Sequence, residues 1–267
     1  MLKPHPPDQS IELTDALAAP PPALPRGKAL DEALDAQEKQ LERLQAALAA
    51  EGRRALLVVL QGRDASGKDG TIRRVFGGLN PAACSVTSFK RPSATELAHD
   101  YLWRVHQAVP ARGTFGVFNR SHYEDVIAVR VHRLVPEAVW QKRFDQINAF
   151  EAMLDAEGIV VRKFFLHISR DEQRRRLRER LEDPEKNWKF NEGDLRERAL
   201  WDEYTAAYQE VLARCSTPRA PWYLVPANQN KPRDYLIGEA LIQTLTGLAP
   251  RYPAAEPGLI RRLGEIA

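Results

Sequence analysis

Hydrophobic and polar positions form their first regular pattern between Ala29 and Ala50. Leucines recur there at spacings of three, four and seven residues, and Gly52 follows soon after. This pattern predicts an amphipathic helix that ends at the glycine. Residues 1–28 before it are rich in proline, with consecutive prolines at 20–22. We therefore expect an extended or disordered amino-terminal arm and not a fold element.

Beyond this helix, short apolar runs alternate with segments of helical periodicity. The apolar runs predict strands, at 55–61, 85–89, 114–119, 159–169 and 221–227. The helical patterns start at Lys68 and cover 94–109, 136–158, 170–181, 194–214 and 232–245. The alternation predicts an α/β fold, with a parallel sheet and helices on both faces, in one domain over residues 29–248. Residues 249–267 have turn residues and weak periodicity, which predicts a tail or a short docking helix.

Composition narrows the class of protein. The 267 residues are 43% hydrophobic and 28% charged and contain no apolar run of membrane length, so we expect a soluble globular chain and no membrane partner. The formal net charge of +3 is too small to require nucleic acid. Cys84 and Cys215 show no CxxC or Cys/His spacing, so neither a disulfide framework nor a zinc site is expected. The first residues lack signal-peptide features, which predicts a cytoplasmic location.

The strongest local signal is GRDASGKDGT, which begins at Gly62 directly after the first predicted strand. It has the Gly-x-x-x-x-Gly-Lys spacing of a phosphate-binding loop, in which backbone N–H groups and the lysine hold phosphate oxygens. The alternative is a glycine turn that merely joins two elements. The predicted phosphate-binding residues of this loop are Gly62, Ala65, Gly67, Lys68, Asp69 and Gly70.

Two carboxylates make this loop unusual. Asp69 stands where a Ser or Thr hydroxyl would hold Mg²⁺, and Asp64 lies inside the loop. Because bare phosphate would be repelled by both, a bridging Mg²⁺ is expected. For Asp69, helix capping and compensation of the helix dipole is an equally good interpretation.

A second polar cluster, FNRSHYEDV, follows the third predicted strand. Ligands gather at the carboxyl ends of strands in open α/β sheets, so Asn119, Arg120, Glu124 and Asp125 should face the phosphate loop. A chance polar loop is the alternative. His122 is better interpreted as a hydrogen-bonded structural histidine than as a base.

Arginines crowd the segment after the fourth predicted strand. Arg176 and Arg180 share one face of its helix, and Lys186 and Lys189 follow. A solvated helix face is the simplest interpretation, but the excess of cations predicts a phosphate-clamping lid at about residues 170–195. RNA binding is disfavoured because aromatic residues do not alternate with the arginines.

Taken together, five ordered motifs resemble a family-2 polyphosphate kinase over about residues 29–248. They are GRDASGKDGT, FNRSHYEDV, HISRDEQ, RLEDPEKNWKF and APWYLVPAN. The resemblance implies a three-layer, thymidylate-kinase-like P-loop kinase fold with a helical lid. It also implies an enzyme that transfers phosphoryl groups from magnesium-bound polyphosphate to nucleotides, and a homo-oligomer, either dimer or tetramer.

Site residues follow from the resemblance position by position. Asp64 and Lys68 match the metal-binding acid and the phosphate-binding lysine, Arg120 matches a phosphate-binding arginine, and Arg176, Arg180 and Lys189 match the lid. The FNRSHYED version resembles the subgroup that phosphorylates both AMP and ADP. Many members have Asp at the position of Asn119, so the second metal-binding and catalytic acid is assigned to Asp125. The predicted nucleotide-binding residues are Asn119, Arg120, Glu124, Asp125 and Arg130.

The implied reaction is an in-line transfer, in which a nucleotide phosphate oxygen attacks the terminal phosphorus of polyphosphate. Asp64, Lys68, Arg120 and Asp125 are the predicted catalytic residues. Two alternatives remain at this point: an ATP-dependent nucleotide kinase, and a non-catalytic protein that binds polyanions.

Overall fold

A computed structural model of the chain describes residues 1–185, 187–190, 192–256 and 266, and all their side chains except that of Lys189. Lys186 and most of the predicted tail or short docking helix at 249–267, namely residues 257–265 and 267, therefore lie outside the described residues. No helix in these ranges is long and apolar enough to span a membrane.

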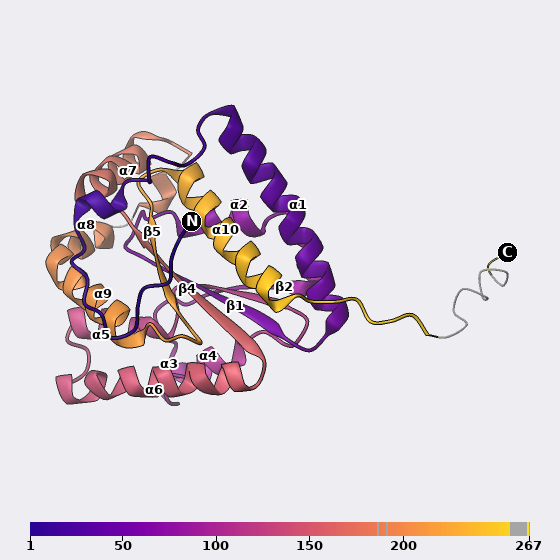
Figure 1. The fold of residues 1–267 in the computed structure, drawn as a ribbon. Coiled ribbons are helices and arrows are strands. Elements are labelled where there is room, and N and C mark those ends of the chain that lie inside the picture. Colours follow the sequence, from indigo (N-terminus) through magenta and orange to yellow (C-terminus); the bar gives the residue numbers. More distant parts are fainter. Residues whose placement is uncertain (186, 191, 257–265, 267) are drawn as a thin grey trace.

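Five parallel strands form one sheet at the centre of the molecule (Figure 1). They are β1 (Ala55–Gln61), β2 (Cys84–Ser88), β3 (Phe115–Asn119), β4 (Ile159–His167) and β5 (Trp222–Pro226), in the spatial order β2-β3-β1-β4-β5. Every residue of β1 is buried, as expected for the central strand of a covered parallel sheet. Leu60 near the end of β1 pairs with Asn119 of β3 on one side and Phe164 of β4 on the other. The loops after these strands therefore meet at one edge of the sheet.

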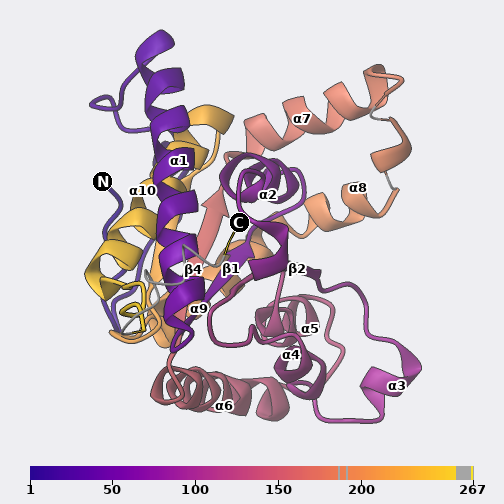
Figure 2. The ribbon, with the colours of Figure 1, turned by 90° about the vertical axis from the view of Figure 1, so that its right-hand side faces the viewer.

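Helices cover both faces of the sheet and make a three-layer fold (Figures 1 and 2). One layer contains α1 (Lys28–Glu51), α2 (Lys68–Phe76) and α10 (Asn230–Leu248). The other contains α4 (Trp103–Gln107), α5 (Ala128–Val131), α6 (Glu137–Ala156) and α9 (Trp201–Cys215). Along β1, Leu56, Val58 and Leu60 face the first layer, whereas Leu57 and Val59 face the second. This alternation follows from the two-residue period of a strand.

The remaining elements are short or project from the sheet. The α3 helix (Ala94–Leu97) lies before α4, and α7 (Arg170–Glu182) and α8 (Glu192–Ala199) form a hairpin beyond the carboxyl ends of the strands (Figure 2). The 3₁₀ turns are η1 (Asp15–Ala18), η2 (Pro81–Ala83), η3 (His122–Asp125) and η4 (Asn187–Lys189). The predicted P-loop fold, sheet and helical segment after the fourth strand are confirmed.

Two predicted helices are each divided in the structure. The helix expected over 94–109 becomes α3 and α4, because the side chain and carbonyl of Asp100 accept the N–H groups of Leu102 (3.0 Å) and Trp103 (3.1 Å). The helix expected over 194–214 becomes α8 and α9. In both cases the helical pattern of apolar residues in the sequence continues across the break. The helix itself ends there because the backbone N–H groups bond to other partners.

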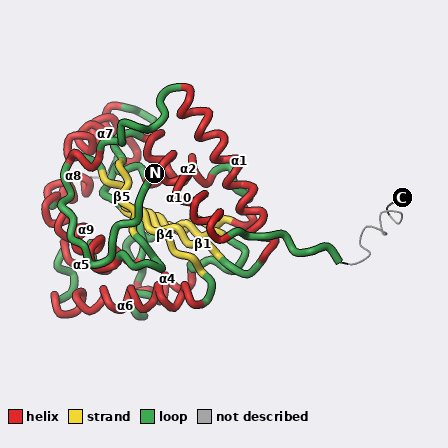
Figure 3. The backbone as a smooth tube through the Cα atoms, in the orientation of Figure 1, coloured by secondary structure: helices red, strands yellow, loops and turns green. Residues whose placement is uncertain are grey.

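The arm is also more ordered than its composition predicts. Apart from η1, residues 1–27 form irregular structure with several turns, and they lie along β5 and α9 (Figure 3). The side chains of Leu13 and Ala18 are buried, with exposed fractions of 9% and 0%. The proline-rich composition did not predict this packing on the domain.

A buried ionic network ties the second layer to the sheet. Lys163 of β4 is fully buried, and its Nζ donates to Glu151 Oε2 (2.5 Å), the Tyr123 hydroxyl (2.7 Å) and the Cys215 carbonyl (2.6 Å). His122 Nε2 lies 3.2 Å from Glu151 Oε1, which confirms the structural interpretation of this histidine. Burial opposes ionisation of Glu151, but the charge of Lys163 and the hydrogen bond with His122 outweigh it and lower the pKa of that carboxyl. Through His122 and Tyr123, the network fixes the loop that follows β3.

Breaking this network on one side should strongly destabilise the protein. Lys163→Met is expected to lower the free energy of unfolding by about 3–5 kcal/mol, because Glu151 is left as an unpaired buried charge. Adding Glu151→Gln should recover part of the loss. Urea unfolding of both variants tests this, with Lys28→Met as the control, because the Lys28–Glu32 pair is exposed and is worth at most about 1 kcal/mol. Equal losses in Lys163→Met and Lys28→Met would contradict the argument.

Candidate active site

The phosphate loop connects β1 to α2, as the sequence predicts. Gly62, Ala65 and Gly67 have positive φ angles of 154°, 64° and 98°, which turn the backbone sharply around the loop. A Cβ atom at Gly67 would lie 1.9 Å from Nη1 of Arg233, so a side chain there would require this guanidinium to move, and the φ of 98° also favours glycine. The helix that starts at Lys68 directs its free N–H groups and its positive dipole end toward the loop.

Lys68 closes over this loop. Its Nζ donates to the carbonyls of Gly62 (2.7 Å) and Arg63 (3.2 Å), and the side chain is buried. Burial, with the nearby charge of Arg120, lowers the pKa of the Lys68 ammonium to about 8. The lysine is thus a cation at neutral pH. It is held at the loop, beside the position that a bound phosphate group would take.

Asp64 and Arg120 face each other across the site. Arg120 Nη2 donates to Asp64 Oδ1 (2.5 Å), and Arg120 Nη1 lies 3.5 Å from Glu124 Oε2. Arg120 has a φ of 63°, an uncommon conformation that directs its side chain toward the P-loop. The charges of Glu124 and Asp64 raise the pKa of the Arg120 guanidinium, although its burial opposes this.

Asp69 has a different partner. Its Oδ1 accepts a 2.7 Å hydrogen bond from Nδ2 of Asn119, the last residue of β3. Asn119 therefore connects β3 to the start of α2. The contact places the carboxylate of Asp69 and the amide of Asn119 on one wall of the site.

These residues border a cavity of about 750 Å³. Its lining includes four acidic side chains, Asp64, Asp69, Glu179 and Asp194. It also includes eight basic ones, Lys68, Arg73, Lys90, Arg120, Arg175, Arg176, Arg180 and Arg233. A cavity with twice as many cations as anions is suited to a ligand with many negative charges.

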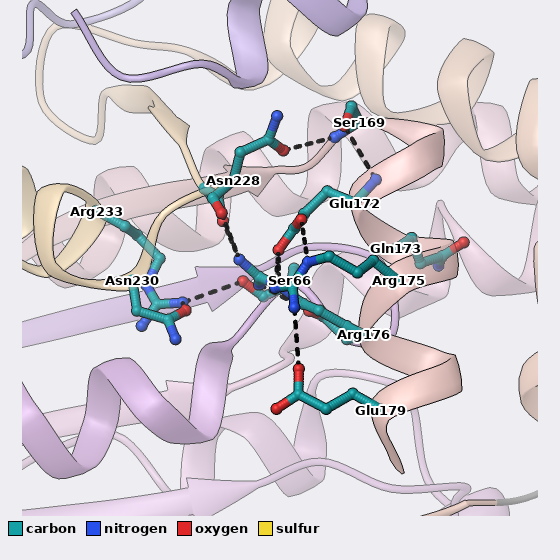
Figure 4. A network of polar contacts seen from close by, with 12 residues as sticks. Ser66, Ser169, Glu172, Gln173, Arg175, Arg176, Glu179, Asn228, Asn230 and Arg233 are labelled. Carbon is teal, nitrogen blue, oxygen red and sulfur yellow. Dashed lines mark hydrogen bonds and ion pairs between the residues drawn. The ribbon is translucent and has the colours of Figure 1, made fainter. Parts of the chain in front are cut away.

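The predicted lid brings its arginines to this cavity. Arg176 donates to the carbonyls of Ala65 (2.9 Å) and Ala227 (2.6 Å), and its Nε donates to Glu172 (2.6 Å) (Figure 4). Arg180 lies 3.3 Å from Asp194. Both arginines thus have acidic partners in the folded chain. The predicted role of Lys189 concerns a side chain outside the described part.

Among the predicted site residues whose side chains are described, four do not line this cavity: Gly62, Glu124, Asp125 and Arg130. Asp125 accepts from Arg143 (3.1 Å) and lies 4.0 Å from Arg104, and it does not line the cavity. Burial raises the pKa of its carboxyl to about 6 against the opposing charges of these two arginines. Arg130 is paired with Glu210 and borders a different hollow. Neither Asp125 nor Arg130 reaches the P-loop cavity, because the turn η3 directs the chain away from the cavity after Arg120.

Glu124 is held by Arg120 and does not line the cavity either.

Arg233 is a site residue that the sequence did not reveal. Its guanidinium is 1% exposed, donates to Asp234 (2.8 Å) and Asn230 (2.8 Å), and reaches the carbonyl of Ser66 (3.4 Å). Asp234 in turn accepts from the Thr71 hydroxyl (2.8 Å). The only sequence signal was a basic residue in the first turn of the last helix, which is too common a feature to indicate a site.

The oxygen donors at this cavity fit a magnesium ion. Mg²⁺ usually binds one or two carboxylates together with substrate phosphates and water, and does not need a cage of protein ligands. Asp64 and Asp69 provide such carboxylates at the cavity wall. Within the described ranges, no group of three or more His, Cys, Asp or Glu side chains is arranged to hold a metal. A magnesium ion held by these two carboxylates would take its remaining ligands from phosphate oxygens and water.

Comparisons with known proteins agree with this geometry. A family model described as Polyphosphate kinase 2 matches residues 27–251. An AMP/ADP-polyphosphate phosphotransferase of Meiothermus ruber is 57% identical over 225 residues, which cover 84% of each chain. An ADP-polyphosphate phosphotransferase of Rhodopseudomonas palustris is 45% identical over 244 residues, covering 87% of this chain and 84% of the relative.

Solved structures show the same relationship. The crystal structure of polyphosphate kinase 2 from Arthrobacter aurescens TC1 superposes with a TM-score of 0.88 at 40% identity, covering 92% of this chain and 89% of that one. The family predicted from the five motifs is thereby confirmed. The phosphate loop, the cation-rich cavity and the match over nearly the whole domain lead to one conclusion: this chain belongs to the polyphosphate kinase 2 family.

Proposed function

We propose that this protein transfers phosphoryl groups between inorganic polyphosphate and nucleoside mono- and diphosphates, converting AMP to ADP and ADP to ATP. The observation that carries the proposal is the cavity at the phosphate-binding loop, which eight basic side chains line. The Meiothermus ruber relative is named as an AMP/ADP-polyphosphate phosphotransferase and the Rhodopseudomonas palustris relative as an ADP-polyphosphate phosphotransferase, which supports the choice of donor and acceptors.

In the proposed reaction, the terminal phosphate oxygen of the nucleotide attacks the terminal phosphorus of polyphosphate in line. The bond from that phosphorus to the bridging oxygen breaks, and polyphosphate leaves one unit shorter. The acceptor phosphate is largely ionised at neutral pH, so positioning matters more than removal of a proton. Lys68 and Arg120 would neutralise negative charge on the transferring group, and Arg176 and Arg180 would hold the donor chain.

We also propose Mg²⁺ as the cofactor, held by Asp64 beside the phosphates. When bound, it would supply charge neutralisation and orientation of the phosphate oxygens. Asp125 is no longer proposed as a ligand because Arg143 and Arg104 engage it away from the cavity; it instead supports the loop after β3. Assembly into a homo-oligomer, a cytoplasmic location and the division into arm, domain and tail stay predictions.

A direct test compares donors. With Mg²⁺ present, polyphosphate and ATP are supplied side by side with AMP or ADP as acceptor. The proposal requires turnover with polyphosphate and both acceptors. Use of ATP alone would favour an ATP-dependent nucleotide kinase, and no turnover with any nucleotide would favour a polyanion-binding protein.

Loss of the P-loop lysine should remove most activity. Lys68→Ala is expected to reduce kcat by on the order of 100-fold, because a preorganised charge at the transferring phosphate is lost. Lys142→Ala, at an exposed position on α6, is the matched control and should keep its activity. A folded Lys68→Ala variant with near-normal kcat would contradict the assignment.

The pH dependence of kcat/KM should reflect the ionisation of the same lysine, Lys68. Since the pKa of Lys68 is lowered to about 8 in the free protein, kcat/KM for polyphosphate should fall as pH rises through about 8, where the ammonium loses its proton. Below that pH the charge is present. Lys68→Arg keeps a cation at all these pH values, so its profile should lack this fall, whatever its absolute rate. A fall at the same pH in both proteins would assign it to another group.

Removing the negative charge of Asp64 inside the phosphate loop should weaken the binding of Mg²⁺. Asp64→Asn is expected to raise the Mg²⁺ concentration for half-maximal activity by on the order of tenfold. Glu124→Gln is the control, because it removes the other acidic partner of Arg120 without changing a cavity-lining residue. Equal magnesium shifts in both variants would show that orientation of Arg120, and not metal binding, is responsible.

A further inference from the structure

The amino-terminal arm is fastened to the domain on its way to the active-site edge. The amide of His5 donates to the Trp222 carbonyl (2.7 Å), and the amide of Asp8 donates to the Ala213 carbonyl (3.1 Å). Leu13 then packs into the core of the second layer, with its amide bonded to Gln209 (2.9 Å). The arm crosses β5 in this way and arrives at the carboxyl ends of β4 and β5 (Figure 1).

At that edge the arm surrounds the segment between β4 and α7. His167, the last residue of β4, has its Nε2 2.9 Å from the Thr14 carbonyl, which can only accept, so this nitrogen carries the proton. Asp15 Oδ1 accepts from the backbone amide of Arg170, the first residue of α7 (3.3 Å). Arm contacts therefore lie on both sides of Ser169, the residue that caps α7.

Asn228 extends these contacts to the phosphate loop. Its amide donates to the Ala18 carbonyl (3.1 Å), and its Oδ1 accepts from the Ser169 amide (2.9 Å) (Figure 4). The carbonyls of Asn228 and Ala227 accept from Arg176, which also donates to Ala65 in the P-loop. A continuous series of hydrogen bonds thus leads from the arm to the loop.

The α7 helix depends on such contacts because it buries little apolar surface. Only Gln173 and Leu177 are buried among its thirteen residues. Hydrophobic packing fixes most helices in globular proteins, so a helix with one buried leucine is positioned mainly by polar bonds at its base. Ser169, Asn228 and the arm supply such bonds at the base of α7. Arg198 of α8 adds bonds to the Arg170 carbonyl (2.8 Å) and to Gln173 (2.9 Å), and Gln173 donates to the Asp64 carbonyl (3.0 Å).

We propose that residues 14–18 of the arm are a positioning segment of the active site: they hold the base of α7 so that Arg176 stays against the P-loop for the polyphosphate donor. The proposal rests on the proposed function for the identity of the donor. It concerns residues that do not line the cavity, and it gives the proline-rich arm a role in donor binding.

The turn η1 offers a matched pair of variants. Ala18 is fully buried, whereas Ala16 in the same turn is exposed. Ala18→Leu should displace the turn because there is no room for the larger side chain, and Ala16→Leu adds the same atoms in solvent. We expect Ala18→Leu to raise KM for polyphosphate by on the order of tenfold, with KM for AMP changed less than twofold.

A second measurement does not depend on catalysis. Amide hydrogen exchange at Ser169, Arg170 and the rest of α7 should be faster in Ala18→Leu than in Ala16→Leu, with unchanged exchange in β1. If Ala18→Leu does not fold, Asp15→Ala should still speed exchange at Arg170, with Glu12→Ala as its matched control. Equal exchange and equal KM values within these pairs would overturn the proposal.

Arg176→Ala separates this proposal from the proposed function. If it weakens polyphosphate use while Ala18→Leu behaves like Ala16→Leu, the arm is not a positioning segment, but the donor site stands. If Arg176→Ala leaves KM for polyphosphate unchanged, the proposed donor site itself is wrong.

Discussion

The closest packing at the active site is at Gly67, and the arrangement of the surrounding helices depends on it. The guanidinium of Arg233 occupies the space of a side chain at this position, and Arg176 lies 3.4 Å from the same point. These arginines come from α10 and α7, on different sides of the loop. A Cβ at position 67 would displace the guanidinium of Arg233, whereas Arg176 would stay at ordinary van der Waals distance. The missing side chain therefore lets Arg233 reach the backbone of the phosphate loop beside Arg176.

Charge balance explains how such a cluster of cations can exist in the folded chain. Three of the arginines close to the loop have carboxylate partners: Arg120 has Asp64, Arg176 has Glu172 and Arg233 has Asp234. These pairs offset the repulsion between cations and hold their side chains in defined directions. A phosphate ligand would thus meet groups that are already oriented, which is the condition for effective electrostatic stabilisation.

Support for the site comes from well beyond the cavity. The buried Lys163–Glu151 pair fixes the loop after β3, and Asp125 is held to Arg143 of α6 within that loop. On the other side, the arm and Asn228 fix the base of α7. Strongly polar segments flank the P-loop, and each is attached to the sheet by a small number of buried or partly buried polar contacts.

Features that depend on neighbouring residues could be predicted from the sequence alone. The run at 55–61 matches β1 residue for residue, and Gly62, Gly67 and Lys68 form the phosphate loop in the predicted strand–loop–helix order. Short-range patterns can predict these features because strand periodicity, glycine turns and helix starts depend on local geometry. Arg120 was found because it directly follows a strand of a parallel sheet, where strand ends converge, and Arg176 because arginines crowd the helix after the fourth strand.

Which polar residues reach the cavity depends on the tertiary fold and does not follow from their closeness in the sequence. Asp125 and Arg130 are close to Arg120 in sequence, yet the turn η3 directs them to Arg143 and Glu210. Arg233, in contrast, lies 167 positions from Ser66 and still reaches it. The packing of the arm and the division of two helices likewise depend on contacts between distant segments or on a change of backbone partners. No local pattern carries that information, because such contacts form only when the layers are assembled around the sheet.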